Sequence, residues 1–209
     1  MSRDTGIPGV RGGQMQQANL LANIGRPIPV SRMPNFVVRV FVPPFDQFEK
    51  RTGITFGVRA GCFAPRTKTQ EASGLAGLFG GSRTTTEIEP YWPGFFVQFN
   101  SKADGRHKED SAHFLLRATE RGHDFKGPEI TGSGWWTLGM SFTPDGMVHF
   151  YARHGVENLR ASDHLSSRYC YGMKCQTFET FFFNICSPDN GRTWSTPWII
   201  DDPELFLAR

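Results

Sequence analysis

The chain lacks several features that would mark particular classes of protein. It contains no apolar run of about 18 residues, which excludes an ordinary membrane-spanning helix. Its 23 Lys and Arg residues nearly balance its 20 Asp and Glu residues, and a formal net charge of +3 is too small to indicate a nucleic-acid partner. It also has no P-loop, dinucleotide-binding or nucleophile-elbow motif. The sequence therefore gives no motif signal for the familiar nucleotide-dependent enzymes or for the α/β-hydrolases.

The N-terminal segment lacks the continuous apolar core of a secretory signal. Residues 1–33 are instead rich in Gly, Gln, Asn, Arg and Pro, which predicts a flexible arm ahead of one domain spanning residues 34–209. The protein is therefore either made without a signal or begins after one. Our working expectation is an extracellular or cell-envelope location.

Cysteine and metal signals are also sparse. The four cysteines allow two disulfides or four reduced thiols: Cys62, Cys170, Cys175 and Cys186. Cys170 and Cys175 have no second pair at zinc-ligand spacing, so no metal site and no cofactor is predicted. Calcium at Asp201, Asp202 and Glu204 is the alternative to a solvated acidic turn.

What the chain does contain is typical of a sheet protein. It has 19 Phe, 5 Trp, 23 Gly and 14 Pro, a mixture of strand-forming aromatic residues and turn-forming residues. Residues 36–42 alternate, with Arg39 between apolar neighbours on one face, which predicts a strand. Further strands are predicted at 53–62, 95–101, 112–118, 135–142, 147–153, 177–186 and 193–200. This pattern predicts an all-β, two-sheet antiparallel sandwich of the jelly-roll kind.

The segments between these strands carry turn signals. Thr143-Pro144-Asp145-Gly146 predicts a tight turn, and therefore a hairpin spanning residues 135–153. A second hairpin, from Phe181 to Trp198, is predicted to turn at residues 187–191. Residues 63–93 show little periodicity and are expected to form a long loop, or a loop with one short strand, with an apolar tip at 74–81.

Residues 187–194 resemble the Asp box of sialidase-type propellers, with the pattern S-x-D-x-G-x-T-W. Such boxes recur in every blade of a propeller, whereas this chain has one full copy and too few residues for the fold. We therefore expect a structural hairpin, in which the Asp side chain bonds the loop backbone and Trp194 packs beneath it.

The stretch Gly-Trp-Trp-Thr-Leu-Gly-Met-Ser at 134–141, with the aromatic hairpin after it, resembles the concanavalin A-like lectin and glucanase superfamily, which includes laminin-G domains. The resemblance covers residues 34–209 and implies a jelly roll. Glycosidases of that superfamily carry paired carboxylates on one strand, and this pair is absent. Its lyases use a Gln-x-His strand, whereas Gln98 here is followed by Phe99 and Asn100. A lyase using His149, Tyr151 and Arg153 remains an alternative.

Sorting the strands by face yields the predicted binding site. The outward positions collect Arg, amide and aromatic side chains, and those predicted to bind a ligand are Arg59, Asn100, Arg117, Trp135, His149, Tyr151 and Arg153. If these strands share a sheet, the side chains form one surface that suits sugars, because sugar rings stack on aromatic rings while hydroxyl and carboxylate groups bond Arg and Asn. A polar outer face is equally typical of any sandwich.

Three functions remain open from the sequence. The first is a non-catalytic module that binds carbohydrate or another envelope component, with no catalytic residue. The second is a structural subunit that contacts a protein partner or another copy of itself through residues 1–33 and the 74–81 loop. The third is a polysaccharide-cleaving enzyme, either a lyase or a glycosidase.

Overall fold

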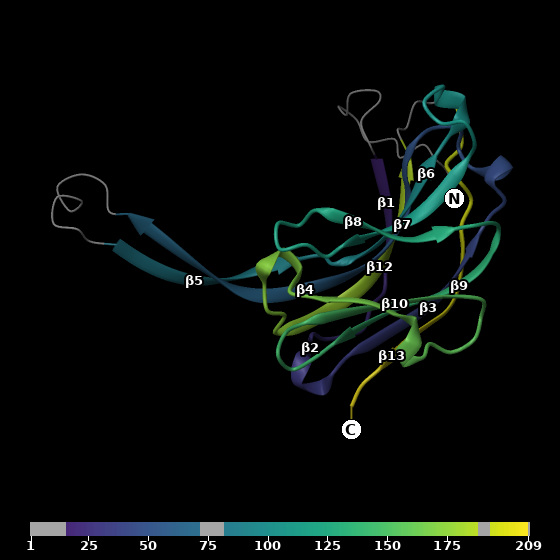
Figure 1. The fold of residues 1–209 in the computed structure, drawn as a ribbon. Coiled ribbons are helices and arrows are strands. Elements are labelled where there is room, and N and C mark those ends of the chain that lie inside the picture. Colours follow the sequence, from purple (N-terminus) through teal and green to yellow (C-terminus); the bar gives the residue numbers. More distant parts are fainter. Residues whose placement is uncertain (1–15, 72–81, 188–192, 209) are drawn as a thin grey trace.

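A computed structural model describes residues 16–71, 82–187 and 193–208. Two antiparallel sheets pack face to face, so the predicted all-β sandwich is confirmed (Figure 1). The described helical segments are all single turns of 3-10 helix. None of the described segments forms a helix with the length and apolar character that a membrane crossing needs.

The larger sheet has eight strands. Its main path runs β1-β12-β4-β6-β7-β8, with β2 paired to β12 and β5 paired to β4. The strands are β1 (Gln16–Leu21), β2 (Ile28–Pro29), β4 (Gly53–Glu71), β5 (Ser82–Tyr91), β6 (Gly94–Asn100), β7 (Ser111–Arg117), β8 (Asp124–Ile130) and β12 (Thr177–Ser187).

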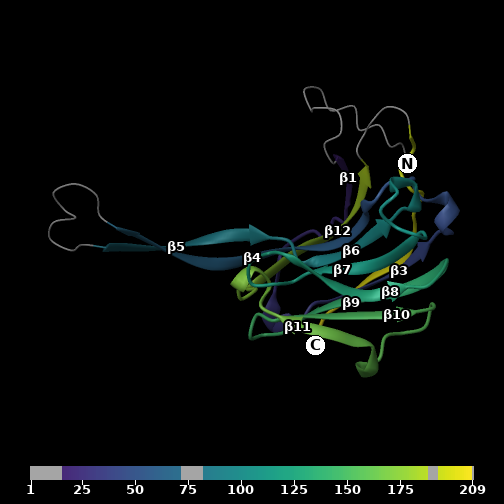
Figure 2. The ribbon, with the colours of Figure 1, turned by 45° about the horizontal axis from the view of Figure 1, so that its top comes forward.

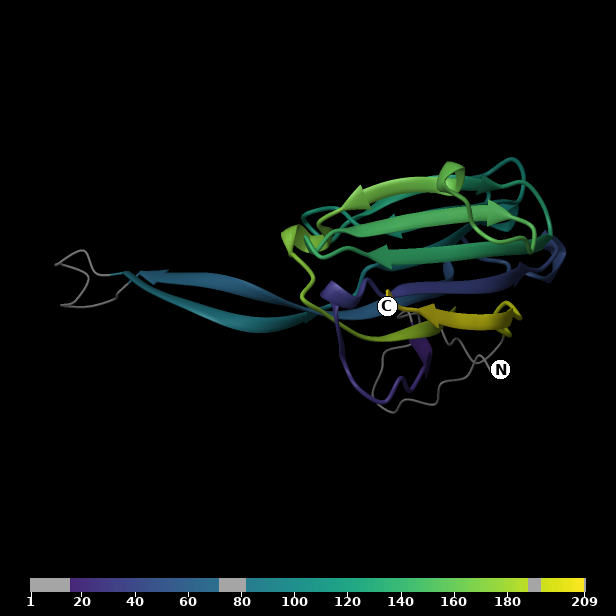
Figure 3. The same ribbon diagram turned by 90° about the horizontal axis from the view of Figure 1, so that it is seen from below.

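The smaller sheet has five strands in the order β11-β10-β9-β3-β13. They are β3 (Asn35–Val42), β9 (Gly134–Phe142), β10 (Val148–His154), β11 (His164–Arg168) and β13 (Ile199–Phe206). Figure 3 shows these strands side by side in the same order.

The core lies between the sheets and is filled by the inward positions of each strand. In β3, burial alternates along the strand, and Val38 and Val40 are fully buried. Phe36 stacks on Phe181 of the opposite sheet with ring centroids 4.1 Å apart. Burying each such side chain contributes about 1.5–3 kcal/mol. The two-residue period in the sequence therefore determines which side chains join the sheets.

The predicted hairpin over residues 135–153 is confirmed. β9 pairs with β10, and Phe142 lies opposite Val148. The turn closes with a 2.8 Å hydrogen bond from Gly146 N to Thr143 O, and Gly146 has a φ of 87°, which favours glycine.

The predicted hairpin from Phe181 to Trp198 is wrong. β12 belongs to the larger sheet, whereas β13 pairs with β3 in the smaller one. The predicted strand at 193–200 is also displaced, since β13 begins at Ile199. Residues 188–192 of the Asp-box-like motif lie outside the described residues, and Trp194 is 67% exposed.

The expected loop at 63–93 is instead largely a two-stranded ribbon. The β4–β5 pairing runs from Cys62 opposite Tyr91 to Glu71 opposite Ser82, and the ribbon extends well beyond the sandwich (Figures 1 and 2). Lys68 is 2.5 Å from Glu89 across it. Most described ribbon side chains are at least partly exposed, so the sequence shows no apolar alternation there. The 74–81 tip lies outside the described residues.

Part of the predicted N-terminal arm is integrated into the fold. β1 pairs with β12, Asn184 Nδ2 donates to Asn19 Oδ1 at 2.5 Å, and Ala22 N donates to Phe181 O at 2.9 Å. The predicted arm therefore contributes a strand to the larger sheet from Gln16 on, while residues 1–15 lie outside the described residues. All four cysteines are buried free thiols.

Candidate functional site

The structure divides the seven predicted binding residues between the two sheets. Arg59, Asn100 and Arg117 belong to β4, β6 and β7 of the larger sheet, whereas Trp135, His149, Tyr151 and Arg153 belong to β9 and β10 of the smaller one. Because the sheets pack through their inner faces, their outward side chains point in opposite directions. The prediction of one shared surface is therefore replaced by two separate surfaces.

The outer face of the smaller sheet is organised in rows across the strands. One row joins Asn35 of β3, Ser141 of β9, His149 of β10 and Ser167 of β11 through direct strand pairing. Directly paired residues point to the same side of a sheet, so these side chains are neighbours. The row brings together amide, hydroxyl and imidazole groups.

The next row consists of Val37, Gly139, Tyr151 and His164. The rings of Tyr151 and His164 meet edge to face, with centroids 5.2 Å apart. Gly139 has no side chain, and Leu159 occupies the space above it. A Cβ built at Gly139 would lie 2.5 Å from Leu159 Cδ1. Leu159, in the loop after β10, thus reaches over the sheet at the one position of the row without a side chain.

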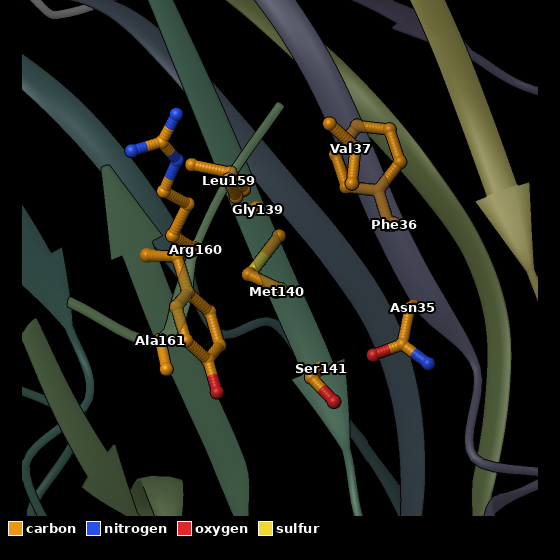
Figure 4. A pocket seen from close by; sticks show the side chains of 10 residues that line it. Asn35, Phe36, Val37, Gly139, Met140, Ser141, Leu159, Arg160 and Ala161 are labelled. Carbon is orange, nitrogen blue, oxygen red and sulfur yellow. The ribbon is translucent and has the colours of Figure 1, made fainter. Parts of the chain in front are cut away.

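Five residues of these two rows line an open pocket of about 340 Å³ (Figure 4): Asn35, Val37, Gly139, Ser141 and Tyr151. Figure 4 shows Asn35 and Ser141 on one side, and Leu159, Arg160 and Ala161 on the other. The walls thus combine apolar surface with an amide, a hydroxyl and a guanidinium. Sequence reasoning missed Leu159 and Arg160, because a loop that folds over a sheet leaves no periodic signal.

The arginines of this face differ in whether a carboxylate neutralises their charge. Arg39 pairs with Asp202 at 2.8 Å, and Arg153 lies 3.7 Å from Asp163. Arg160 is exposed, and no salt bridge joins it to a carboxylate in the described part of the chain. Its guanidinium is therefore available to an acidic group in the pocket.

Beside the pocket, five side chains form a continuous hydrogen-bond chain. Thr143 Oγ1 donates to Asp145 Oδ1 at 2.5 Å and lies 3.0 Å from His149 Nε2. His149 Nδ1 is 2.7 Å from Ser167 Oγ, which is 2.8 Å from His164 Nε2. Burial lowers the pKa of His149, and the neighbouring His164 lowers it further. The bond from Thr143 lowers the pKa of Asp145.

Ser167 also lines a cleft of about 620 Å³ near the edges of the two sheets. The lining residues come from the loop before β8, from β8 itself, from the turn before β10 and from β11 with its flank: Thr119, Glu120, Arg121, His123, Phe125, Met147, Ser167, Arg168 and Tyr169. The strand β11 was not predicted, so both Ser167 and His164 were missed from the sequence.

The outer face of the larger sheet is built differently. Arg59 and Arg117 lie on either side of Gly94 in one row, and the ring of Phe96 packs against both guanidiniums at 5.3 and 4.5 Å. Phe182 stacks on the far side of Arg59 at 5.3 Å. Aromatic rings and cations therefore alternate in a ladder, in which each contact contributes about 0.5–2 kcal/mol.

This ladder is closely packed. Phe96 is 1% exposed and Arg59 is 9% exposed. Arg117 is held by a two-point salt bridge to Asp124 at 2.9 and 3.0 Å, which raises the pKa of the arginine. Burial lowers the pKa of Arg59, whose Nη2 donates to the Trp92 carbonyl at 3.1 Å. The side chains of the ladder thus mainly pack against one another and leave little open surface.

Asn100 lies apart from both arginines, at the opposite end of β6 from Gly94. Its Nδ2 donates to Ser111 Oγ at 3.2 Å, and it lines a pocket of about 320 Å³ with Asp110 and His113. The predicted residues of the larger sheet therefore form two sites and not one.

The proposed calcium ligands lie along β13. Asp202 has a φ of 44° at a bulge in the pairing with β3, and its carboxylate is bonded to Arg39. Within the described ranges, no group of three or more His, Cys, Asp or Glu side chains is arranged to hold a metal ion.

No family model and no curated protein matches this chain. A heptameric pentraxin from Limulus polyphemus is similar at 13% identity, with 94% of this chain and 77% of that chain covered and a TM-score of 0.35. An alginate lyase from Pseudomonas aeruginosa is similar at 9% identity, with coverage of 91% and 74% and a TM-score of 0.42. An alginate lyase from Alteromonas follows at 10% identity, 81% and 57% coverage, and a TM-score of 0.28. Likenesses this distant concern the fold and not the function.

Proposed function

We propose that the protein is a carbohydrate-binding module whose ligand occupies the pocket on the outer face of the smaller sheet. The observation that carries this proposal is the composition of the pocket walls. Tyr151, Val37 and Leu159 supply ring and aliphatic surface, while Asn35 and Ser141 supply hydrogen-bonding groups. A volume of about 340 Å³ falls within the range of about 300–1,000 Å³ that is typical of small-ligand sites.

Arg160 favours an acidic sugar over a neutral one. The guanidinium stands at the rim without a carboxylate partner among the described residues, and a uronate or sulfate group would supply one. A hydrogen bond to a charged group contributes about 1.5–3 kcal/mol, so an acidic sugar is expected to bind about 10-fold to 100-fold more tightly than its neutral counterpart.

A glycan array, run with and without calcium, tests this proposal. The variants are Tyr151→Ala and Arg160→Ala, and the control is Asn100→Ala, a predicted binding residue on the opposite sheet. We expect Tyr151→Ala to abolish detectable binding, Arg160→Ala to weaken acidic glycans selectively, and Asn100→Ala to bind normally.

The absence of detectable binding to both acidic and neutral glycans would contradict the proposal. Loss of binding in the Asn100→Ala control alone would move the site to the larger sheet. Assaying the bound glycans for newly released reducing ends separates recognition from cleavage, which the lyase alternative requires.

A second candidate function is assembly, which the projecting ribbon favours. The paired strands extend from the sandwich beyond Cys62 and Tyr91, where they contribute little to the core. Joining Pro65 to Ile88, which face each other in register, through an Asn-Gly turn removes the ribbon while preserving the pairing. If the ribbon mediates assembly, light scattering will show fewer copies per particle for the shortened chain than for the full chain. The same number of copies per particle in both chains, at an unchanged melting temperature, would exclude this role.

A further inference from the structure

In the hydrogen-bond chain on the smaller sheet, the donor and the acceptor of each bond can be assigned. Asp145 is an ionised carboxylate and can only accept, so the single hydroxyl proton of Thr143 is directed to it across 2.5 Å. Thr143 Oγ1 must then accept from His149, which places a proton on His149 Nε2. In the neutral ring, this leaves Nδ1 as an acceptor.

The same logic extends to the serine. His149 Nδ1 accepts, so the Ser167 hydroxyl donates to it across 2.7 Å. Ser167 Oγ has no further proton, and His164 Nε2 must therefore carry one and donate to that oxygen across 2.8 Å. Every proton in the chain thus points from His164 toward Asp145, and the Ser167 proton points at a neutral imidazole nitrogen.

We propose that Ser167 is a nucleophile for carboxylic esters, with His149 as its general base. Asp145 and Thr143 hold the His149 ring in the tautomer that leaves Nδ1 free, which is the arrangement that activates a serine. Ser167 is half-buried and lines the cleft of about 620 Å³, a space beside the residue that can receive a substrate.

The reaction balances with water as the only co-reactant. Ser167 Oγ attacks the ester carbonyl carbon while its proton passes to His149 Nδ1. The bond from that carbon to the alcohol oxygen then breaks, and the alcohol leaves with the proton from His149. Water attacks the acyl-serine, gives a proton to His149, and the acid leaves as the proton returns to Ser167 Oγ.

The surroundings of Ser167 indicate how the intermediate would be stabilised. His164 Nε2 lies 2.8 Å from Ser167 Oγ, and we assign it as the donor to the carbonyl oxygen that would gain charge. Arg121 and Arg168 line the same cleft, where Arg168 lies over the Phe125 ring at 5.7 Å. The two arginines favour an ester that itself carries a negatively charged group, and the inference is independent of carbohydrate binding in the neighbouring pocket.

A fluorophosphonate probe tests the proposal, because its phosphorus reacts with an activated serine and releases fluoride. Intact mass and peptide mapping on the full chain locate the adduct. We expect one adduct on Ser167, none on Ser167→Ala, and labelling at least about 100-fold slower for His149→Gln. Thr143→Val, which leaves Ser167 and His149 in place, should slow labelling by a smaller factor.

Ser111→Ala is the matched control, since Ser111 is also a strand serine bonded by a side chain, but by the amide of Asn100 instead of an imidazole. It should label at the unchanged rate. The proposal is overturned if the folded wild-type chain gains no adduct, if Ser167→Ala labels equally, or if His149→Gln labels at the wild-type rate. Hydrolysis of p-nitrophenyl acetate should follow the same order across these variants.

Discussion

The outer faces of the two sheets carry similar residue types in different arrangements. On the larger sheet, Arg59 fills the space above Gly94 with its own side chain, whose Cγ lies 2.8 Å from the position of a Cβ there. On the smaller sheet, the space above Gly139 is occupied by Leu159 from a loop, and a pocket remains beside it. On the larger sheet, side chains of neighbouring strands fill the space above the glycine, and the arginines and aromatic rings form a packed ladder. On the smaller sheet, a loop side chain fills that space, and an open pocket remains.

The largest expected difference concerns stability. Phe96→Ala removes a fully buried ring from between two guanidiniums and should lower the free energy of unfolding by about 3–5 kcal/mol. Tyr151→Ala removes a half-buried ring from a pocket wall and should cost less than about 2 kcal/mol. Urea denaturation measures both values. Equal losses would mean that the two faces are packed alike.

A matched pair of glycine substitutions gives the next largest effect. In Gly94→Ala, the new Cβ would lie 2.4 Å from Val58 O and 2.8 Å from Arg59 Cα, so backbone must move, at a cost of about 1–3 kcal/mol. In Gly139→Ala, the close atom is a terminal methyl of Leu159, which can rotate, and the cost should stay below about 1 kcal/mol.

Thermal unfolding compares the two glycine variants, and the glycan assay shows whether moving Leu159 alters the pocket. A larger stability loss for Gly139→Ala than for Gly94→Ala would contradict this account of the two faces.

The smallest effect is a pH dependence that both faces share. Burial lowers the pKa of His113 on the larger sheet, with Lys126 adding to the effect and Glu129 opposing it. The pKa of His149 is lowered by burial and by His164, with Asp145 opposing. The unfolded chain therefore binds more protons than the folded one as the pH falls through the ordinary value of 6.5, and stability decreases over that window.

His113→Gln and His149→Gln should each flatten this decrease, and unfolding at pH 7.5 and pH 5.5 (about one unit either side of the usual histidine pKa) measures the change. An unaltered pH slope in His149→Gln would show that its imidazole is not held neutral by the fold. Only the His149 substitution should also slow labelling of Ser167.

Much of the fold could be predicted because burial imposes a period on the sequence. Strands with one apolar face, such as residues 36–42 and 135–142, were located within a residue or two of their observed ends. The strands β5, β8 and β11 were missed, because their burial alternates weakly or not at all. The hairpin from Phe181 to Trp198 was mispredicted, since adjacent segments were assumed to pair, although β12 and β13 lie in different sheets.

The candidate site was predictable only in part for a related reason. Alternation placed His149, Tyr151 and Arg153 on one face of one strand, and the structure agrees. Alternation could not show that Arg59 and Arg117 belong to a different sheet from His149, because the alternation within one strand does not tell which strands are its neighbours.

The sequence by itself determined the two-layer architecture, the turn at Thr143–Gly146 and the core-facing side of the strands that have one apolar face, because these depend on local geometry and on the burial of apolar surface. The tertiary structure alone decided which outward residues meet. Leu159 over Gly139, and Ser167 between His149 and His164, are contacts between segments whose pairing depends on the competition of all strands for partners. The packing of the whole sandwich decides which strands pair, and the hydrophobic period of a single segment does not.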